Sequence, residues 1–270
     1  MGIFGRRLLK VVIIMLATVA LATSARAATF TKASVKGTYG FMTVLSTANP
    51  KTTTFGMVGA MVFDGAGHLT AAYTSNSGGV VKTGTWGGTY SVNSDGTGGI
   101  DITTGGNATF AITLNSTAAG VAHGLQLLLI DDSNNEVVSG TAALQSAAKQ
   151  TYSVASLKGN YAILGNSWTA AANDKQEGVT GILTFDGKGN GTALATVMWG
   201  GALLGPKSQT FTYAVNSNGI GSVLLAHGAH WAFALNSVAA GQAEGLQFLV
   251  TVSTDLDNGS LVLEGTAVAQ

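Results

Sequence analysis

The 270-residue sequence lacks cysteine, has only two prolines, and is sparsely charged, since 10% of its residues are Asp, Glu, Lys or Arg. The absence of cysteine excludes a disulfide scaffold, an iron–sulfur protein and a thiol nucleophile. Disordered tails combine low hydrophobicity with high charge, so a chain that is 46% hydrophobic is not one of them. The 38 glycines, with so little proline, indicate many turns between short extended segments and not a collagen-like repeat.

The first 27 residues are expected to form an export signal that is removed. Arg6 and Lys10 give this segment a positive start, and an apolar run covers residues 11–21. Residues 25–27, Ala-Arg-Ala, have the small-x-small pattern that signal peptidase cleaves. The apolar run is shorter than the about 20 residues of a membrane helix, so no stable membrane span is expected after cleavage. This predicts an exported protein, located in the periplasm, at the cell surface or in the medium.

The chain that remains after cleavage has no arginine. All three arginines and one lysine lie in the signal, which leaves nine cations against 13 anions and a net charge of −4. Arginine is the preferred partner of phosphate and the commonest side chain that recognises guanine. An acidic chain without arginine makes a poor nucleic-acid binder, so no nucleic-acid partner is expected.

The strongest signal in the sequence is an internal repeat. Segments of the first half return in the second half at offsets of 121 to 125 residues, and the offset changes only where glycine and asparagine are frequent. Loops accept insertions at such places with little loss of stability. The matching segments are 33–39 with 155–161, 63–67 with 185–189, 124–126 with 245–247, and 140–142 with 265–267. The repeat predicts two domains after the signal, 28–148 and 149–270.

Each domain is predicted to be an eight-stranded barrel. Extended segments alternate with clusters of Asn, Asp and Gly, which tolerate the left-handed backbone of hairpin turns, and no helical period lies between them. Closing such a meander removes its two sheet edges. In the first copy the expected strands are 37–45, 55–63, 69–75, 80–92, 98–103, 108–114, 122–130 and 136–144. The predicted fold class is therefore all-β, with two tandem antiparallel eight-stranded up-and-down β-barrels.

Alternation along the strands predicts which side chains point inwards, because successive residues of a strand face opposite sides. Phe110 and Ile112 share one face of their strand, and the second copy has Trp231 and Phe233 at the matching positions. These bulky side chains are expected in the barrel interiors.

The expected strand 122–130 is apolar on both faces. Leu128 and Ile130 lie opposite the inward set and so point out of the barrel. We expect this outer face to contact the other barrel or a second molecule. Because low charge also favours association, self-association is an expected form of partnership.

Four residues are candidate ligand contacts at a barrel mouth or in a lumen. His123 and its counterpart Glu244 stand at the start of matching strands, although solvated strand ends often carry such residues. Trp231 has interior parity, and Asp101 is a candidate for a polar group in the lumen. No Gly-x-Ser-x-Gly, His-Glu-x-x-His or Walker motif occurs, so no catalytic residue and no cofactor are predicted.

No metal site is predicted either. His227 and His230 are three residues apart, which sends them to opposite faces of a strand. Asp64 and Asp186 each open a Phe-Asp-Gly-x-Gly segment without the further acids of a calcium loop. We expect these two carboxylates to accept hydrogen bonds from backbone N–H groups of their own turns.

The order of motifs resembles a known kind of protein. The sequence has Val-Lys-Gly-Thr-Tyr-Gly-Phe at 35–41, Phe-Asp-Gly-Ala-Gly at 63–67, Gly-Thr-Tyr-Ser-Val at 88–92 and Gly-Thr-Ala at 140–142. This pattern is similar to that of a family of exported bacterial tandem β-barrel repeat proteins of uncharacterised function. Their barrels resemble in shape those of allene oxide cyclase, dirigent and calycin proteins. The resemblance implies a fold, and no catalytic residues are carried over with it.

The expected function is that of an exported, non-catalytic tandem β-barrel that binds a small apolar ligand or has a structural role at the cell surface. An eight-stranded barrel either fills itself with side chains or holds one small ligand. One alternative is a barrel isomerase or cyclase of the allene oxide cyclase type, which needs an apolar cavity with a buried acid or histidine. Another is an outer-membrane barrel of sixteen strands, which needs aromatic girdles although aromatics are only 7% of the chain.

Overall fold

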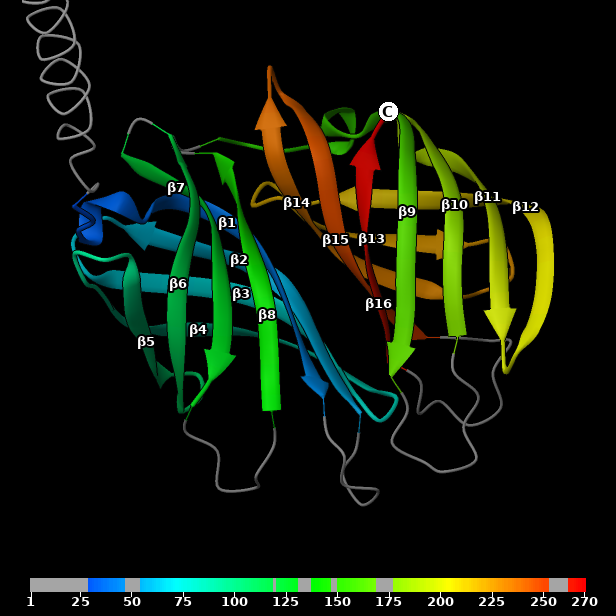
Figure 1. The fold of residues 1–270 in the computed structure, drawn as a ribbon. Helices are drawn as coiled ribbons and strands as arrows, with labels where there is room; N and C mark the ends of the chain where they lie inside the picture. The colour runs from blue at the N-terminus through cyan, green and yellow to red at the C-terminus, as the bar shows by residue number, and fades with distance from the viewer. Residues whose placement is uncertain are drawn as a thin grey trace, which may run out of the picture.

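The computed structural model of the protein describes residues 29–46, 54–118, 120–130, 137–146, 150–168, 177–252 and 262–270. Their strands close into two antiparallel barrels of eight that lie side by side (Figure 1), so the predicted all-β tandem fold is confirmed. The export signal expected at residues 1–27 lies outside the described residues. In the described part of the chain, no helix has the length and hydropathy of a membrane span.

The first barrel follows sequence order, and its last strand pairs with its first to close it. Its strands are β1 (Lys36–Ser46), β2 (Phe55–Asp64), β3 (His68–Ser77), β4 (Val80–Val92), β5 (Thr97–Thr104), β6 (Ala108–Ala118), β7 (Val121–Leu129) and β8 (Val137–Ser146). Each predicted segment corresponds to one strand. The largest difference is in β6, which continues four residues beyond its expected end at residue 114.

The second barrel repeats this arrangement, and its eighth strand pairs with its first. Its strands are β9 (Lys158–Trp168), β10 (Glu177–Asp186), β11 (Asn190–Trp199), β12 (Ala202–Val215), β13 (Ile220–Leu225), β14 (His230–Ala239), β15 (Gln242–Val252) and β16 (Val262–Ala269). Because β8 returns to β1 and β16 to β9, the alternative of one sixteen-stranded barrel is wrong.

One end of the first barrel is closed by an aromatic cluster and a short helix, η1 (Lys32–Ser34). The ring of Phe63 packs edge-on against Tyr39 and Tyr90, with centroids 5.4 and 5.0 Å apart. The Tyr90 hydroxyl donates to the carbonyl oxygen of Val35 at 2.8 Å and lies 3.0 Å from that of Lys32. These bonds hold η1 across the end of the barrel.

The second barrel closes its corresponding end in the same way, with η2 (Val154–Ser156). Phe185 packs edge-on against Tyr161 and Tyr213, at 5.2 and 4.9 Å. The Tyr213 hydroxyl lies 3.0 Å from the carbonyl oxygens of Val154 and Leu157. The residues that recur in both halves of the sequence therefore build the closed ends, which is a folding role.

The Phe-Asp-Gly-x-Gly segments form the β2–β3 and β10–β11 turns. Asp64 Oδ1 accepts hydrogen bonds from the backbone N–H groups of Ala66, Gly67 and His68 at 2.7, 2.9 and 3.0 Å. Asp186 accepts equivalent bonds two and four residues on, at 2.7 and 3.0 Å. The predicted turn role of both carboxylates is confirmed.

The barrels contact each other through unlike walls. Strands β1, β2, β3 and β8 of the first barrel pack against β14 and β15 of the second. A buried cluster at this contact consists of Val58, Ala232, Ala234 and Leu249. The expected contact between the barrels through Leu128 and Ile130 is wrong, because these side chains are 44% and 59% exposed. Leu249, the counterpart of Leu128, lies in the contact instead, since the second barrel presents this wall and the first does not.

Candidate functional site: a cavity in the second barrel

The two barrels differ in how completely their interiors are filled. The first encloses about 10 Å³ of space beside Phe41 and Trp86. The second contains a cavity of about 220 Å³. An apolar cavity of roughly 150 Å³ is large enough to take up benzene. Among the described residues, the interior of the second barrel therefore has room for a small molecule and that of the first does not.

The difference follows from three interior positions. In the first barrel Trp86 stacks on Phe41 and packs against Tyr73, with centroids 6.0 and 4.7 Å apart. The counterparts in the second barrel are Ile163, Ala195 and Gln209. Both barrels close with eight strands, so ring volume that is missing from the interior remains as open space.

The cavity walls are mainly aliphatic, and all eight strands of the second barrel contribute to them. Trp231 of β14 lines the cavity and stacks on Phe248 of β15, with centroids 4.9 Å apart. Trp199, at the end of β11, adds a second indole to the lining. Such walls favour the burial of an apolar molecule.

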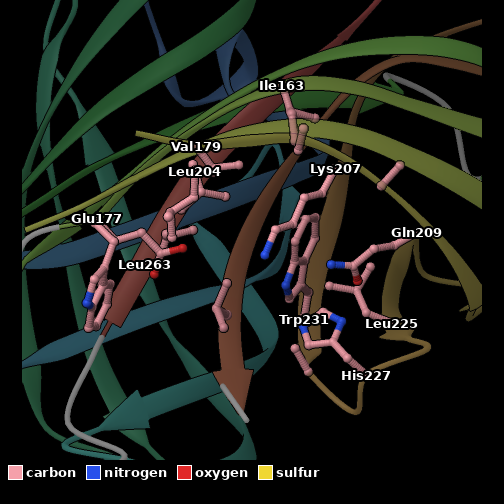
Figure 2. A pocket seen from close by; sticks show the side chains of 16 residues that line it. Ile163, Glu177, Val179, Leu204, Lys207, Gln209, Leu225, His227, Trp231 and Leu263 are labelled. Carbon is pink, nitrogen blue, oxygen red and sulfur yellow. The ribbon is translucent and has the colours of Figure 1, made fainter. Parts of the chain in front are cut away.

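Four polar side chains complete the lining. Figure 2 shows Lys207, Gln209 and His227 grouped around Trp231, with Glu177 on the other side of the cavity. The Gln209 Oε1 atom is buried and accepts no hydrogen bond. A buried oxygen without a donor favours a ligand that has an O–H or N–H group to donate to it.

A β-bulge in β12 gives the cavity two of its lining residues, Leu204 and Lys207. Val197 of β11 pairs with Leu204, and Ala195 pairs with Lys207, so two residues of β12 oppose one of β11 between them. Residues three apart on a regular strand would face opposite sides. The extra residue lets both Leu204 and Lys207 border the cavity.

The cavity lies toward the end of the barrel that the aromatic cluster leaves open. Glu177 is the first residue of β10, Trp199 is the last residue of β11, and His227 follows the end of β13. Phe185 and Tyr213, which belong to the closed end, lie near the other ends of β10 and β12. Leu204, which is 42% exposed, lies at the solvent side of the lining.

The structure places His123 and Glu244 away from this cavity. Both side chains are exposed, and both follow residues of the closed ends. The carbonyl oxygens of Ala122 and Ala243 accept hydrogen bonds from Tyr39 and Tyr161, each at 2.6 Å. The expected mouth position of His123 and Glu244 therefore has to be corrected, because these strand starts lie where each barrel is sealed.

Asp101 lies on the outside of the first barrel, whereas Trp231 lies inside the second. Asp101 is exposed on the outer face of β5, between the buried Ile100 and Ile102, so the lumen position expected for it is not observed. Trp231 is 9% exposed and lines the cavity. Its role as a ligand contact stays a prediction.

Sequence reasoning missed Glu177, Lys207, Gln209 and His227 as lining residues. Comparison of the two copies contains a signal for two of them, since Phe55 and Trp86 of the first copy correspond to Glu177 and Gln209. Lys207 was hidden by the bulge, which breaks the alternation. Within the described ranges, no group of three or more His, Cys, Asp or Glu is arranged to hold a metal ion.

Comparison with known proteins gives similarity only at the level of solved structures. No family model matches the chain, and no curated protein matches it. A protein of unknown function from the DUF3598 family of Nostoc punctiforme PCC 73102 is 11% identical, with a TM-score of 0.28, and the match covers 87% of this chain and 96% of that one. Kievitone hydratase from Nectria haematococca is 8% identical, with a TM-score of 0.27 and coverage of 87% and 89%. The resemblance to an exported barrel family stays a prediction.

Proposed function

We propose that the exported chain binds a small, mainly apolar molecule in its second barrel, while the first barrel is a packed structural domain. The observation that carries this proposal is the contrast between a cavity of about 220 Å³ in the second barrel and about 10 Å³ in the first. Two barrels with the same strand order and the same closed end differ in this respect because three interior side chains are smaller in the second. Space maintained within an otherwise complete barrel supports a binding role.

The cavity's size and lining define the class of ligand. Its volume suits a molecule of one or two rings, or a short branched chain, since roughly 150 Å³ already accepts benzene. Glu177 and Lys207 bring one acid and one base to the lining, which favours a ligand without net charge. The buried Oε1 atom of Gln209 favours one hydroxyl or N–H group on that ligand. The proposed ligand is a small neutral hydrocarbon skeleton that carries a single hydrogen-bond donor.

A fluorescence titration of the purified chain without residues 1–27 tests this proposal, with 2-naphthol and naphthalene as probes. We expect saturable binding of both, with 2-naphthol about two- to twelvefold tighter because one hydrogen bond contributes about 0.5–1.5 kcal/mol. Gln209→Met keeps the length of the side chain but removes the acceptor. This variant is expected to lose the preference for 2-naphthol, because the buried hydroxyl then has no acceptor.

The matched variant for the cavity is Ala195→Tyr combined with Gln209→Trp, which reproduces the aromatic pair of the first barrel. It is expected to abolish binding of both probes while the circular dichroism spectrum is unchanged. Glu244→Gln, on the exposed outer surface, is the control and is expected to bind as the parent does. Absence of saturable binding, or binding that persists in the filled variant, would contradict the proposal.

A second candidate is catalysis in the same cavity, as in the isomerase or cyclase alternative. It is favoured by one observation, namely that His227 and Glu177 border the apolar space, where either can act as a general acid or base. Styrene oxide is a suitable probe because it is an apolar epoxide of fitting size. Formation of its isomer phenylacetaldehyde, lost in His227→Gln, would support this candidate, and recovery of unchanged styrene oxide would count against it.

A further inference from the structure

The contact between the two barrels joins two different walls of the repeated unit. The first barrel contributes β1, β2, β3 and β8, which we call the first-strand wall. The second contributes β14 and β15, whose counterparts in the first barrel are β6 and β7; we call this the hairpin wall. Each barrel has both walls, so one contact covers only half of them. Among the described strands, β6 and β7 of the first barrel (its hairpin wall) and most of the first-strand wall of the second (β9, β10, β11 and β16) face away from this contact, which only β16 reaches, through β2.

A hydrogen bond and a buried leucine mark the inner contact. The Gln247 Nε2 atom on β15 donates to the Thr141 hydroxyl on β8 at 2.7 Å. Leu249, on the same face of β15, is fully buried against Val58 and two alanines of β14. At Gly40 the two walls approach so closely that a Cβ atom would collide with the Leu235 carbonyl oxygen.

The repeat places the same hydrogen-bonding groups on the two uncovered walls. Gln126 on β7 is the counterpart of Gln247, and Thr266 on β16 is the counterpart of Thr141. Both of these side chains are exposed. Leu128 is the counterpart of Leu249, and it is 44% exposed where Leu249 is buried. One donor–acceptor pair and the leucine of the inner contact are thus available for a second contact of the same kind.

The uncovered walls also expose large apolar side chains. On the hairpin wall of the first barrel, Leu128 and Ile130 are 44% and 59% exposed. On the first-strand wall of the second barrel, Leu164 and Val268 are 58% and 59% exposed. Leu164 pairs across the sheet with Thr266, so the apolar and hydrogen-bonding groups lie together. Apolar groups gathered on a barrel wall indicate an interaction surface.

We propose that copies of this chain associate head to tail, with the first-strand wall of one second barrel on the hairpin wall of the next molecule's first barrel. This arrangement repeats the contact that the chain already makes between its own barrels, including a Gln126–Thr266 hydrogen bond between molecules. Because the contact joins unlike surfaces, it continues into a ring or an open filament instead of stopping at a dimer.

Three substitutions between the copies make the outer contact weaker than the inner one. Met198 stands at the position of Asn76, whose Nδ2 atom donates across the inner contact to the Val250 carbonyl oxygen at 3.1 Å. Ala162 stands at the position of Gly40, and Thr180 stands at the position of Val58. The added methyl group keeps the walls further apart, and the threonine replaces a fully buried valine. Association is therefore reversible and depends on concentration.

Sedimentation velocity of the chain without residues 1–27 tests the proposal through two variants that each block one wall. Leu128→Asp blocks the hairpin wall, and Leu164→Asp blocks the first-strand wall. The parent is expected to increase its average mass more than about twofold with concentration, and each variant alone is expected to be monomeric. A mixture of the two variants retains one compatible pair of walls, so it is expected to give a heterodimer and nothing larger.

Leu203→Asp is the control, because Leu203 is 69% exposed on β12 outside both walls. This variant is expected to associate as the parent does, and circular dichroism checks that all variants are folded. A parent that stays monomeric at the highest attainable concentration would overturn the proposal. So would a single blocked variant that still dimerises, since this would indicate a contact between like walls. Binding of 2-naphthol is measured separately in the same variants, so failure of one proposal does not decide the other.

Discussion

The first and second barrels have the same strand order and the same closed end but differ at their other end. In the first barrel Phe41, Tyr73 and Trp86 pack together and fill the interior. In the second barrel smaller residues occupy those positions, and Lys207, Gln209 and His227 border the resulting cavity. In this repeated barrel, the residues that stabilise the fold are therefore different from the residues that line the cavity. The former recur in both copies, and the latter differ.

The second barrel has one aromatic side chain at its closed end that the first barrel lacks. Phe211 stands where the first barrel has Gly88, and Gly191 stands where it has Leu69. A Cβ atom on Gly191 would collide with the Phe211 ring, so the glycine makes room for it. Phe211 packs on Phe185 at 5.2 Å and enlarges the aromatic cluster there. The second barrel thus has a cavity toward its open end and denser aromatic packing at its closed end.

The largest expected effect comes from emptying the packed interior. Trp86→Ala removes the ring on which Phe41 and Tyr73 rest, and it is expected to lower the free energy of unfolding of the first barrel by about 3 kcal/mol. Gln209→Ala, at the matching position of the second barrel, is expected to change stability by less than about 1 kcal/mol, because it borders existing space and removes an unpaired acceptor. Hydrogen exchange measured by mass spectrometry distinguishes the two barrels. Equal losses of stability in Trp86→Ala and Gln209→Ala would contradict the conclusion that the first interior is packed and the second is hollow.

A smaller effect, equal in the two barrels, is expected at the shared closed end. Tyr90→Phe and Tyr213→Phe each remove a hydroxyl that bonds the backbone of a short helix, which is expected to destabilise the corresponding barrel by about 1 kcal/mol. The measurement is chemical denaturation of each variant against the parent. A clearly larger loss for one of the two would show that the closed ends are not energetically equivalent.

The same tyrosines predict a loss of stability in alkali. Burial raises the pKa of Tyr90 to about 12 from the ordinary value of 10, and burial also raises the pKa of Tyr213. The folded state thus favours the neutral phenol, so this contribution is fully present below pH 10 and is lost as the pH rises toward 12. Denaturation midpoints measured across this range are expected to fall less steeply in Tyr90→Phe than in the parent.

The smallest effect is expected in acid, at the two turns. Hydrogen bonds from backbone N–H groups lower the pKa of Asp64 and of Asp186 below the ordinary value of 3.8. A lowered pKa in the folded state contributes stability above the ordinary value, and this contribution is lost as the pH falls through the folded value. Acid titrations of stability are expected to become flatter in Asp64→Asn and in Asp186→Asn, by similar amounts.

Much of the fold was accessible from the sequence because its determinants are local. Alternation of Phe110 and Ile112, the turn residues after Phe63, and recurrence of the motifs each involve neighbours along the chain. Trp231 was placed inside the barrel for the same reason, since β14 pairs with β13 without a register shift there and the irregularity beside it adds its extra residue to β15. Lys207 was not, because a bulge reverses the alternation before it.

The contacts between the barrels could be predicted from the sequence only in part. Leu128 and Leu249 are counterparts with the same local pattern, yet one is 44% exposed and the other fully buried. Local pattern indicates that both point outwards, but which of them is covered depends on the neighbouring barrel. For the same reason His123 and Glu244 were placed at a mouth, since parity does not reveal which end of a barrel is sealed.

The sequence was sufficient to predict that this protein is built twice from eight strands joined by repeated turn motifs. That one end of each barrel is sealed, that the second interior is hollow and that unlike walls of the two barrels meet became known from the three-dimensional structure. The physical reason is that strand parity and turn chemistry act between neighbours along the chain. Cavity volume and wall contacts, in contrast, are sums over side chains from all eight strands of a barrel and from the barrel beside it.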